Sequence, residues 1–153
     1  VTIKEAYSTI RTEIEKAMGM TSSAKLDLVV TPKEKQFSVK AAVTELAQPG
    51  EKVLLRFFVI EDRVQYSGQN GVRYHRHVVR ALPGNPVPLT AATSEQKVDV
   101  DPASIRSKQL EFLEESGFPA SMRPLSLTNL KIVAVVQNET TGEVLQTAQA
   151  ELK

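Results

Sequence analysis

The only two histidines of the chain, His75 and His77, are separated by one residue in a segment whose alternating pattern predicts a β-strand. Side chains two residues apart on a strand project from the same face, so the two imidazoles would lie about 7 Å apart. A hairpin closed by Tyr66–Val72 places Glu61 opposite His77 and Arg63 opposite His75. A carboxylate beside two imidazoles could start a zinc or other divalent-metal site, provided that a further ligand arrives from another strand.

The same two histidines also fit a structural polar face, in which each imidazole forms a hydrogen bond with a neighbouring group. Positive charge nearby disfavours a bound cation, and it comes from Arg63, Arg73, Arg76 and Arg80. We therefore expect no resident cofactor. Zinc or another divalent metal held by His75, His77 and Glu61 stays the alternative.

Two arginines of the same predicted strand, Arg76 and Arg80, fall on its opposite face. A guanidinium can hold a carboxylate through two parallel hydrogen bonds, so these side chains are candidates for binding an anion or a partner protein. In the alternative interpretation they pair with Asp62 and Glu61, or their stems cover apolar neighbours.

Two tyrosines, Tyr66 and Tyr74, flank the predicted hairpin loop. They could form a stacking platform for a partner or a sugar, or pack against each other across the strands. A carbohydrate-binding or adhesion function has little further support, because aromatic residues make up only 5% of the chain and tryptophan is absent.

The sequence contains no recognisable catalytic motif. It lacks a glycine-rich phosphate loop, a nucleophile elbow, a dinucleotide fingerprint and a His-Glu-x-x-His helix. With no cysteine among its 153 residues, it also lacks thiol catalysis and disulfides. A net charge of +1 without a basic stripe gives no sign of nucleic-acid binding, and no apolar run is long enough to span a membrane. We predict a protein that is not an enzyme.

Two helices are predicted beside the strands. Thr2 and Glu5 form a capping-box pattern at the start of the first helix, which ends near Gly19. Its apolar residues recur at helical spacing, at Ile3, Tyr7, Ile10, Ile14 and 17–18. The second helix is expected to begin at Pro102, with Asp101 as its N-cap, and to end at Gly117, and its expected inward residues are Ile105, Leu110, Phe112 and Leu113.

Between and after the helices, period-two patterns separated by turn signals predict about seven strands. The longest covers 52–64, and its nearly continuous apolar run from Val53 to Ile60 predicts a strand covered on both faces. The return strand of the hairpin covers 72–82. The sequence therefore predicts a mainly β protein, an antiparallel immunoglobulin-like sandwich at 21–153 with one inserted helix. We expect residues 1–20 to form an N-terminal helix and linker that follow a further upstream domain.

The hairpin carries a family resemblance. The run from Val59 to Gly68, followed by Tyr74-His75-Arg76-His77-Val78-Val79-Arg80 and a closing hairpin at 130–151, resembles the C-terminal domain of certain bacterial envelope proteins. These proteins, which include outer-membrane lipoproteins, join a thioredoxin-like domain to a β-sandwich. The resemblance implies an extracytoplasmic setting and an accessory or protein-interaction role without catalytic residues. It also implies that the partners are the upstream domain of the same polypeptide or another envelope protein.

Overall fold

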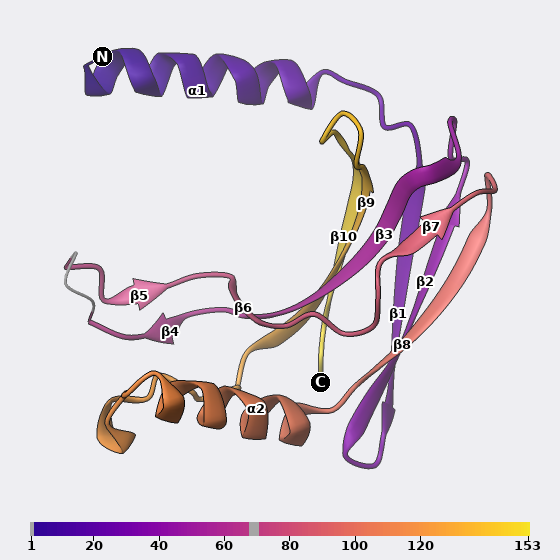
Figure 1. The fold of residues 1–153 in the computed structure, drawn as a ribbon. Coiled ribbons are helices and arrows are strands. Elements are labelled where there is room, and N and C mark those ends of the chain that lie inside the picture. The colour runs from indigo at the N-terminus through magenta and orange to yellow at the C-terminus, as the bar shows by residue number, and fades with distance from the viewer. Residues whose placement is uncertain (1, 68–70) are drawn as a thin grey trace.

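Two antiparallel sheets packed face to face form the body of the protein (Figure 1). The computed structural model describes residues 2–67 and 71–153. The three-stranded sheet has the order β1-β2-β8, with the bounds Lys25–Lys33, Gln36–Thr44 and Ser94–Val100. The five-stranded sheet has the order β10-β9-β3-β6, with β7 also paired to β3. Its strands are β3 (Gly50–Glu61), β6 (Val78–Ala81), β7 (Val87–Leu89), β9 (Leu130–Asn138) and β10 (Val144–Glu151).

This architecture confirms the predicted β-sandwich with an N-terminal helix and one inserted helix. Among the described residues, seven strands are four residues or longer. The N-terminal helix is α1 (Ile3–Met18), the inserted helix is α2 (Pro102–Glu115), and a short 3₁₀ helix follows at Ala120–Met122.

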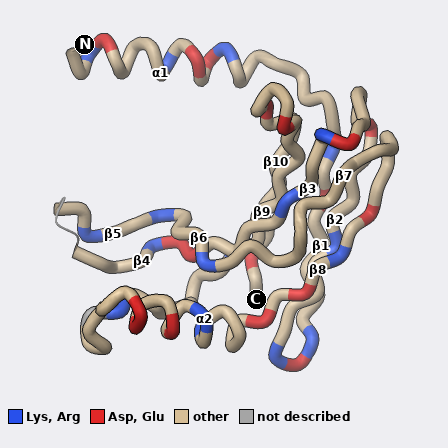
Figure 2. Tube along the Cα trace, viewed as in Figure 1, with Lys and Arg blue, Asp and Glu red and all other residues tan. Residues whose placement is uncertain are grey.

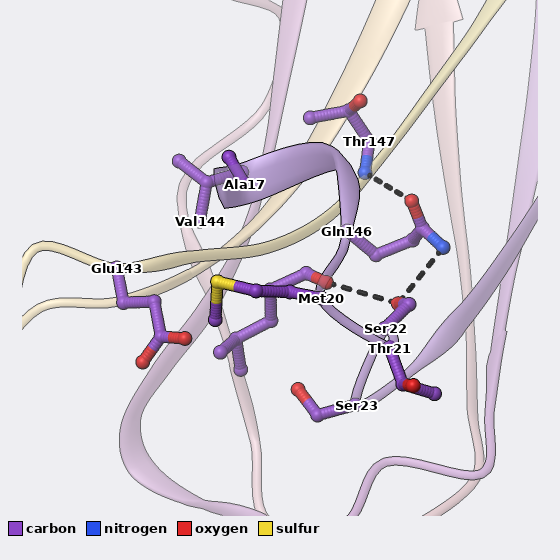
Figure 3. Close-up of a pocket in the computed structure, with 10 residues that line it drawn as sticks. Ala17, Met20, Thr21, Ser22, Ser23, Glu143, Val144, Gln146 and Thr147 are labelled. Atoms are coloured by element: carbon purple, nitrogen blue, oxygen red, sulfur yellow. Dashed lines mark hydrogen bonds between the residues drawn. The ribbon is translucent and has the colours of Figure 1, made fainter. Parts of the chain in front are cut away.

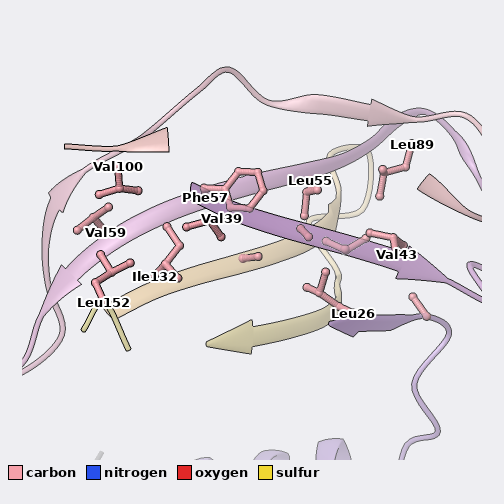
Figure 4. Packing of buried hydrophobic residues seen from close by; sticks show 14 of the residues in the cluster. Leu26, Val39, Val43, Leu55, Phe57, Val59, Leu89, Val100, Ile132 and Leu152 are labelled. Atoms are coloured by element: carbon pink, nitrogen blue, oxygen red, sulfur yellow. The ribbon is translucent and has the colours of Figure 1, made fainter. Parts of the chain in front are cut away.

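The core lies between the two sheets (Figure 4). Alternate residues of β2, β3 and β9 point into it, because side chains along a strand alternate between the two faces. Its fully buried members include Val39, Leu55, Val59, Ile132 and Val136. Burial of side chains of this size contributes about 1.5–3 kcal/mol each, so this single cluster provides most of the driving force for folding.

Only one face of β3 packs into this core. The apolar run from Val53 to Ile60 predicts cover on both faces, but Leu54 and Phe58 are half-buried and belong neither to the core cluster nor to the residues packed against it. The other face of the five-stranded sheet therefore carries apolar side chains that are not part of the core, with polar residues such as Arg56 among them.

Both helices begin as predicted. Thr2 and Glu5 form a reciprocal capping box on α1, and the Asp101 side chain accepts hydrogen bonds from the first turn of α2. Within α2, Ile105 and Leu113 are buried as expected, but Phe112 is 61% exposed because its side of the helix does not meet the sheet. No helix in the described ranges is both long and apolar enough to cross a membrane.

Candidate functional site

The hairpin that carries the two histidines extends from the five-stranded sheet as a narrow projection (Figure 1), called the hairpin arm here (residues 62–67 and 71–77). In it β4 (Val64–Gln65) pairs with β5 (Tyr74–His75). A continuous return strand over 72–82 is wrong, since Arg76 and His77 separate β5 from β6 and His77 has a left-handed φ of 54°. The middle of the predicted loop, residues 68–70, lies outside the described residues.

The register of the hairpin differs by one residue from the prediction. Glu61 lies opposite Val78 rather than His77. His75 likewise pairs with the residue that follows Arg63. Because neighbouring residues of a strand point to opposite faces, a shift of one residue moves each side chain to the other face. The predicted grouping of Glu61 with two imidazoles on one face is therefore absent.

The two histidines have separate surroundings. His75 Nε2 lies 3.1 Å from the carbonyl oxygen of Tyr66, and the two rings are 6.1 Å apart. His77 is exposed. In the described part of the chain, no three His, Asp or Glu side chains are placed to hold one metal ion, so the structure does not bring His75, His77 and Glu61 together as ligands. His75 matches the alternative interpretation, a structural hydrogen bond to a neighbouring group.

A buried ion pair joins Glu61 to Arg80 at the base of the hairpin arm. The side chains of Glu61 and Arg80 are 1% and 6% exposed, and Arg80 Nη2 lies 2.7 Å from Glu61 Oε2. Ser126 Oγ donates to the other carboxylate oxygen at 2.5 Å. Arg80 also donates to the carbonyl oxygen of Pro124, and its own carbonyl accepts from Gln109 of α2. The pair therefore connects β3 and β6 with α2 and the loop that follows it.

A β-bulge accounts for the inward direction of Arg80. Ile60 pairs with Val79, but Val59 pairs with Ala81, so Arg80 is an extra residue in β6. A bulge changes the direction in which a side chain points. The guanidinium of Arg80, which was expected to bind an anion or partner, is buried and occupied by Glu61.

The second arginine of that prediction, Arg76, pairs with Asp62. Arg76 Nε donates to Asp62 Oδ1 at 3.1 Å and Nη2 donates to Oδ2 at 3.0 Å. These hydrogen bonds hold the pKa of the Asp62 carboxyl below its ordinary value. The alternative interpretation, in which Arg76 and Arg80 pair with Asp62 and Glu61, is confirmed for both arginines.

The two tyrosines lie apart from each other. Tyr66 packs beside His75 and at 6.3 Å from the ring of Phe118, which follows α2. Tyr74 is exposed and lies opposite Gln65 in the pair of strands β4 and β5. Tyr66 thus helps to hold the hairpin arm against the segment after α2, and no stacking platform is formed by the pair.

A different surface has no counterpart in the predicted site residues. Across β3, β9 and β10, opposing side chains that point away from the core form rows, such as Phe58 beside Val133 and Val133 beside Gln149. We call this surface the outer sheet face, and its members are Leu54, Arg56, Phe58, Val133, Val135, Gln137, Thr147 and Gln149. A pocket of about 140 Å³ lies at its margin, beside Phe58, and is also lined by Arg56, Leu82 and Pro86. The sequence signal for this face is the apolar run of β3, which only Arg56 interrupts.

The outward face of the three-stranded sheet has the opposite character. Ion pairs cross it, between Lys40 and Glu95 and between Lys33 and Asp99. Antiparallel sheets that face water on one side have polar residues there. The three-stranded sheet follows this rule. On the outer sheet face of the five-stranded sheet, half-buried apolar residues surround one charged residue, Arg56, which pairs with Glu139.

Helix α1 carries a second apolar surface without a partner. No residue of α1 is buried. Its large apolar side chains are 54–91% exposed and form what we call the α1 stripe, consisting of Ile3, Tyr7, Ile10, Ile14 and Met18. Charged residues of both signs cover the rest of the helix (Figure 2). Isolated helices of about 12–15 residues are marginal in water, so a helix with an unburied stripe gains stability from a packing partner.

A pocket lies where α1 joins the sandwich (Figure 3). It has a volume of about 400 Å³ and is lined on one side by Ala17, Met20 and the linker, and on the other by the start of β10. Gln146 Nε2 donates to Ser22 Oγ at 3.0 Å, which attaches the linker to β10. The pocket therefore lies between the base of the α1 stripe and the β10 edge of the outer sheet face.

No protein-family model matches the sequence, and no curated protein matches it. Among solved structures, HBP35 of Porphyromonas gingivalis is similar, with a TM-score of 0.65 and 16% sequence identity over 94% of this chain. This chain spans only 46% of the HBP35 chain. At this identity the likeness shows the fold alone, and that fold is the sandwich with its two helices.

Two further structures are weakly similar. β-Glucosidase 3B from Thermotoga neapolitana matches with a TM-score of 0.38 and 7% identity, over 86% of this chain and 16% of that chain. A β-glucosidase from Kluyveromyces marxianus matches with a TM-score of 0.34 and 12% identity, over 86% of this chain and 14% of that chain. Likenesses this low carry no argument about the fold or the function of this protein.

Proposed function

We propose that this chain is a non-enzymatic protein-interaction module, an immunoglobulin-like β-sandwich of an extracytoplasmic bacterial protein, which docks a protein partner on its outer sheet face. The extracytoplasmic setting and the neighbouring thioredoxin-like domain come from the resemblance of the hairpin at 59–80. The partner is another protein segment: a domain of the same polypeptide, another envelope protein or a second copy of the chain.

One observation carries the proposal, the difference between the two outward faces of the sandwich. Phe58, Val133 and Val135 lie in adjacent strands on the outer sheet face, whereas Lys40 and Glu95 form an ion pair on the other. Apolar surface that adjoins exposed polar residues is characteristic of interaction sites. The charged groups at the base of the hairpin arm do not compete with this proposal, because Glu61 and Arg80 neutralise each other in the interior.

Site-specific photo-crosslinking tests the proposal. A benzoyl-phenylalanine at Gln149, an exposed position of the outer sheet face, is compared in the native cells with one at Lys97 on the three-stranded sheet. We expect a discrete protein adduct from Gln149 only, and its loss when Phe58→Ser is added. Adducts at equal yield from both positions, or from neither, would overturn the proposed function. The mass of the adduct identifies the partner.

A further inference from the structure

Two apolar surfaces in one chain, the α1 stripe and the outer sheet face, are of the two kinds that pack against each other in layered proteins. We propose that two copies of the chain associate by exchanging α1, so that the α1 stripe of each copy packs on the outer sheet face of the other. This proposal rests on the proposed function, because it uses the same docking surface and names its occupant.

The dimensions of the two surfaces allow contact over part of the stripe. α1 has 16 residues, and a helix of that length is about 24 Å long. On the outer side of β3, Ile60 is buried, so the uncovered stretch from Leu54 to Phe58 extends about 13 Å at roughly 3.3 Å per residue. About half of the helix can therefore lie along this strand, and its ends extend beyond it.

The linker holds α1 away from its own sheet. Ser22 Oγ lies 3.1 Å from the carbonyl oxygen of Leu145, and Gln146 Nε2 donates to the carbonyl oxygen of Ala24 at 3.1 Å. With the linker attached to β10 in this way, α1 extends away from the sandwich (Figure 1) and buries none of its residues. In this arrangement α1 buries no residue against its own outer sheet face, which leaves that face open to the helix of a second copy.

The two surfaces are also continuous with each other. The pocket at the base of α1 is lined by Ala17 and Met20 on the helix side and by Val144 on the β10 side, and Met20 and Val144 are both exposed. In one copy the helix therefore adjoins the sheet through a pocket whose lining also includes polar residues of the linker and of β10. In a two-fold dimer the same surface of both copies can be self-complementary, with each helix meeting the other copy's sheet.

Pairing of the helices alone leaves most of this surface exposed. Two α1 stripes packed on each other would cover both helices but neither outer sheet face. Exchange covers all four apolar surfaces of the two copies and is the arrangement that we infer.

The experiment measures the oligomeric state of the purified chain by sedimentation velocity over a wide concentration range. We expect a dimer, weakened at least tenfold by Ile10→Asp in the α1 stripe and equally by Val133→Asp in the outer sheet face. Matched controls are Thr9→Asp on the polar side of α1 and Val29→Asp on the outward side of the three-stranded sheet, which should leave the dimer intact. Thr147→Asp, at an exposed position, replaces Val133→Asp if that variant does not fold.

Mixing the two interface variants distinguishes exchange from other dimers. Ile10→Asp retains an intact outer sheet face and Val133→Asp retains an intact helix, so exchange predicts a 1:1 complex in the mixture, with one of the two contacts formed. Pairing between helices or between sheets predicts no complex in the mixture, and that result would overturn the exchange.

The remaining outcomes separate this inference from the proposed function. A monomer at all concentrations together with a Gln149 adduct to a different protein would overturn the exchange and leave the proposed function standing. A monomer whose outer sheet face is protected from hydrogen exchange, with protection lost in Ile10→Asp, would show that α1 closes on its own sheet and would likewise overturn the exchange. A monomer without any Gln149 adduct would overturn both.

Discussion

The Glu61 carboxylate lies 2.7 Å from the Arg80 guanidinium in the interior, at the point where the hairpin arm leaves the five-stranded sheet. Ser126 occupies the second carboxylate oxygen, so one pair of charges connects β3, β6 and the segment after α2. A buried charge is costly unless it is paired and hydrogen-bonded. This pair is therefore important for keeping the hairpin arm and α2 together.

Removing one member of the pair should strongly destabilise the protein. Arg80→Met leaves the Glu61 carboxylate buried without its counter-charge, and a loss of about 3–5 kcal/mol in the free energy of unfolding is expected. The double variant Glu61→Leu with Arg80→Met contains no buried charge and should recover most of that loss. Urea unfolding of the four proteins gives the coupling between the two side chains. If the double variant lost as much free energy of unfolding as the two single variants together, the two side chains would not be coupled, and the structural role given to the ion pair would be wrong.

The ion pair at the arm provides a contrast, because its arginine lies in solvent although Asp62 is largely buried. Arg76 is largely solvent-exposed, although it contacts Asp62 through two hydrogen bonds. Surface ion pairs contribute little because water and salt screen them. Arg76→Met should therefore change the urea midpoint far less than Arg80→Met does. An equal loss of stability in both variants would mean that any disturbance of the arm, rather than the burial of an unpaired charge, causes the loss.

The ion pair between Asp62 and Arg76 should affect the pH dependence of stability. The pKa of the Asp62 carboxyl is lowered in the folded state, chiefly by the hydrogen bonds from Arg76. The unfolded chain then binds a proton at higher pH than the folded chain, so stability from this group is complete above the ordinary aspartate pKa of about 4 and is lost as the pH falls further. Urea midpoints between pH 6 and 2.5 should fall less steeply for Asp62→Asn than for the unchanged protein. Parallel curves would refute this role.

Zinc should not bind to the histidines with defined stoichiometry. Glu61 is occupied by Arg80 and Ser126, and His75 Nε2 contacts the carbonyl oxygen of Tyr66. After incubation with zinc and removal of excess metal, elemental analysis should find far less than one equivalent per chain. One equivalent of zinc that disappears in His77→Ala would restore the metal-site hypothesis.

Local signals in the sequence predicted the elements well. The helix caps at Thr2 and Asp101 depend on residues within one turn, and the β-strands follow from a period of two. The partners of Arg76 and Arg80 could also be named, because opposite charges on the two strands of one hairpin are close for either register. These features depend on short stretches of chain, which is why the sequence was sufficient for them.

The register and the uncovered sheet face depend on information that the strand pattern does not contain. Loop geometry sets the register of a hairpin, and the bulge at Arg80 adds a residue that alternation alone does not reveal. The apolar run of β3 indicates that both faces avoid water, but it does not say whether the second cover comes from the same chain. The structure supplies that distinction: Leu55 meets the opposite sheet, and Phe58 does not.

Deletion of α1 should leave the sandwich as stable as before at concentrations where the chain is monomeric. No residue of the helix is buried, and the core cluster runs from Ala24 to Leu152, so removal of residues 1–20 takes away no core contact. The urea midpoint of 21–153 should equal that of the full chain. Deletion through Ser23 also removes the Ser22 hydroxyl that Gln146 contacts, and at about 1 kcal/mol per hydrogen bond it should lower stability measurably. If deletion of 1–20 alone destabilises the dilute monomer, α1 packs on its own sheet in solution, and the linker bonds at Ser22 do not hold it away.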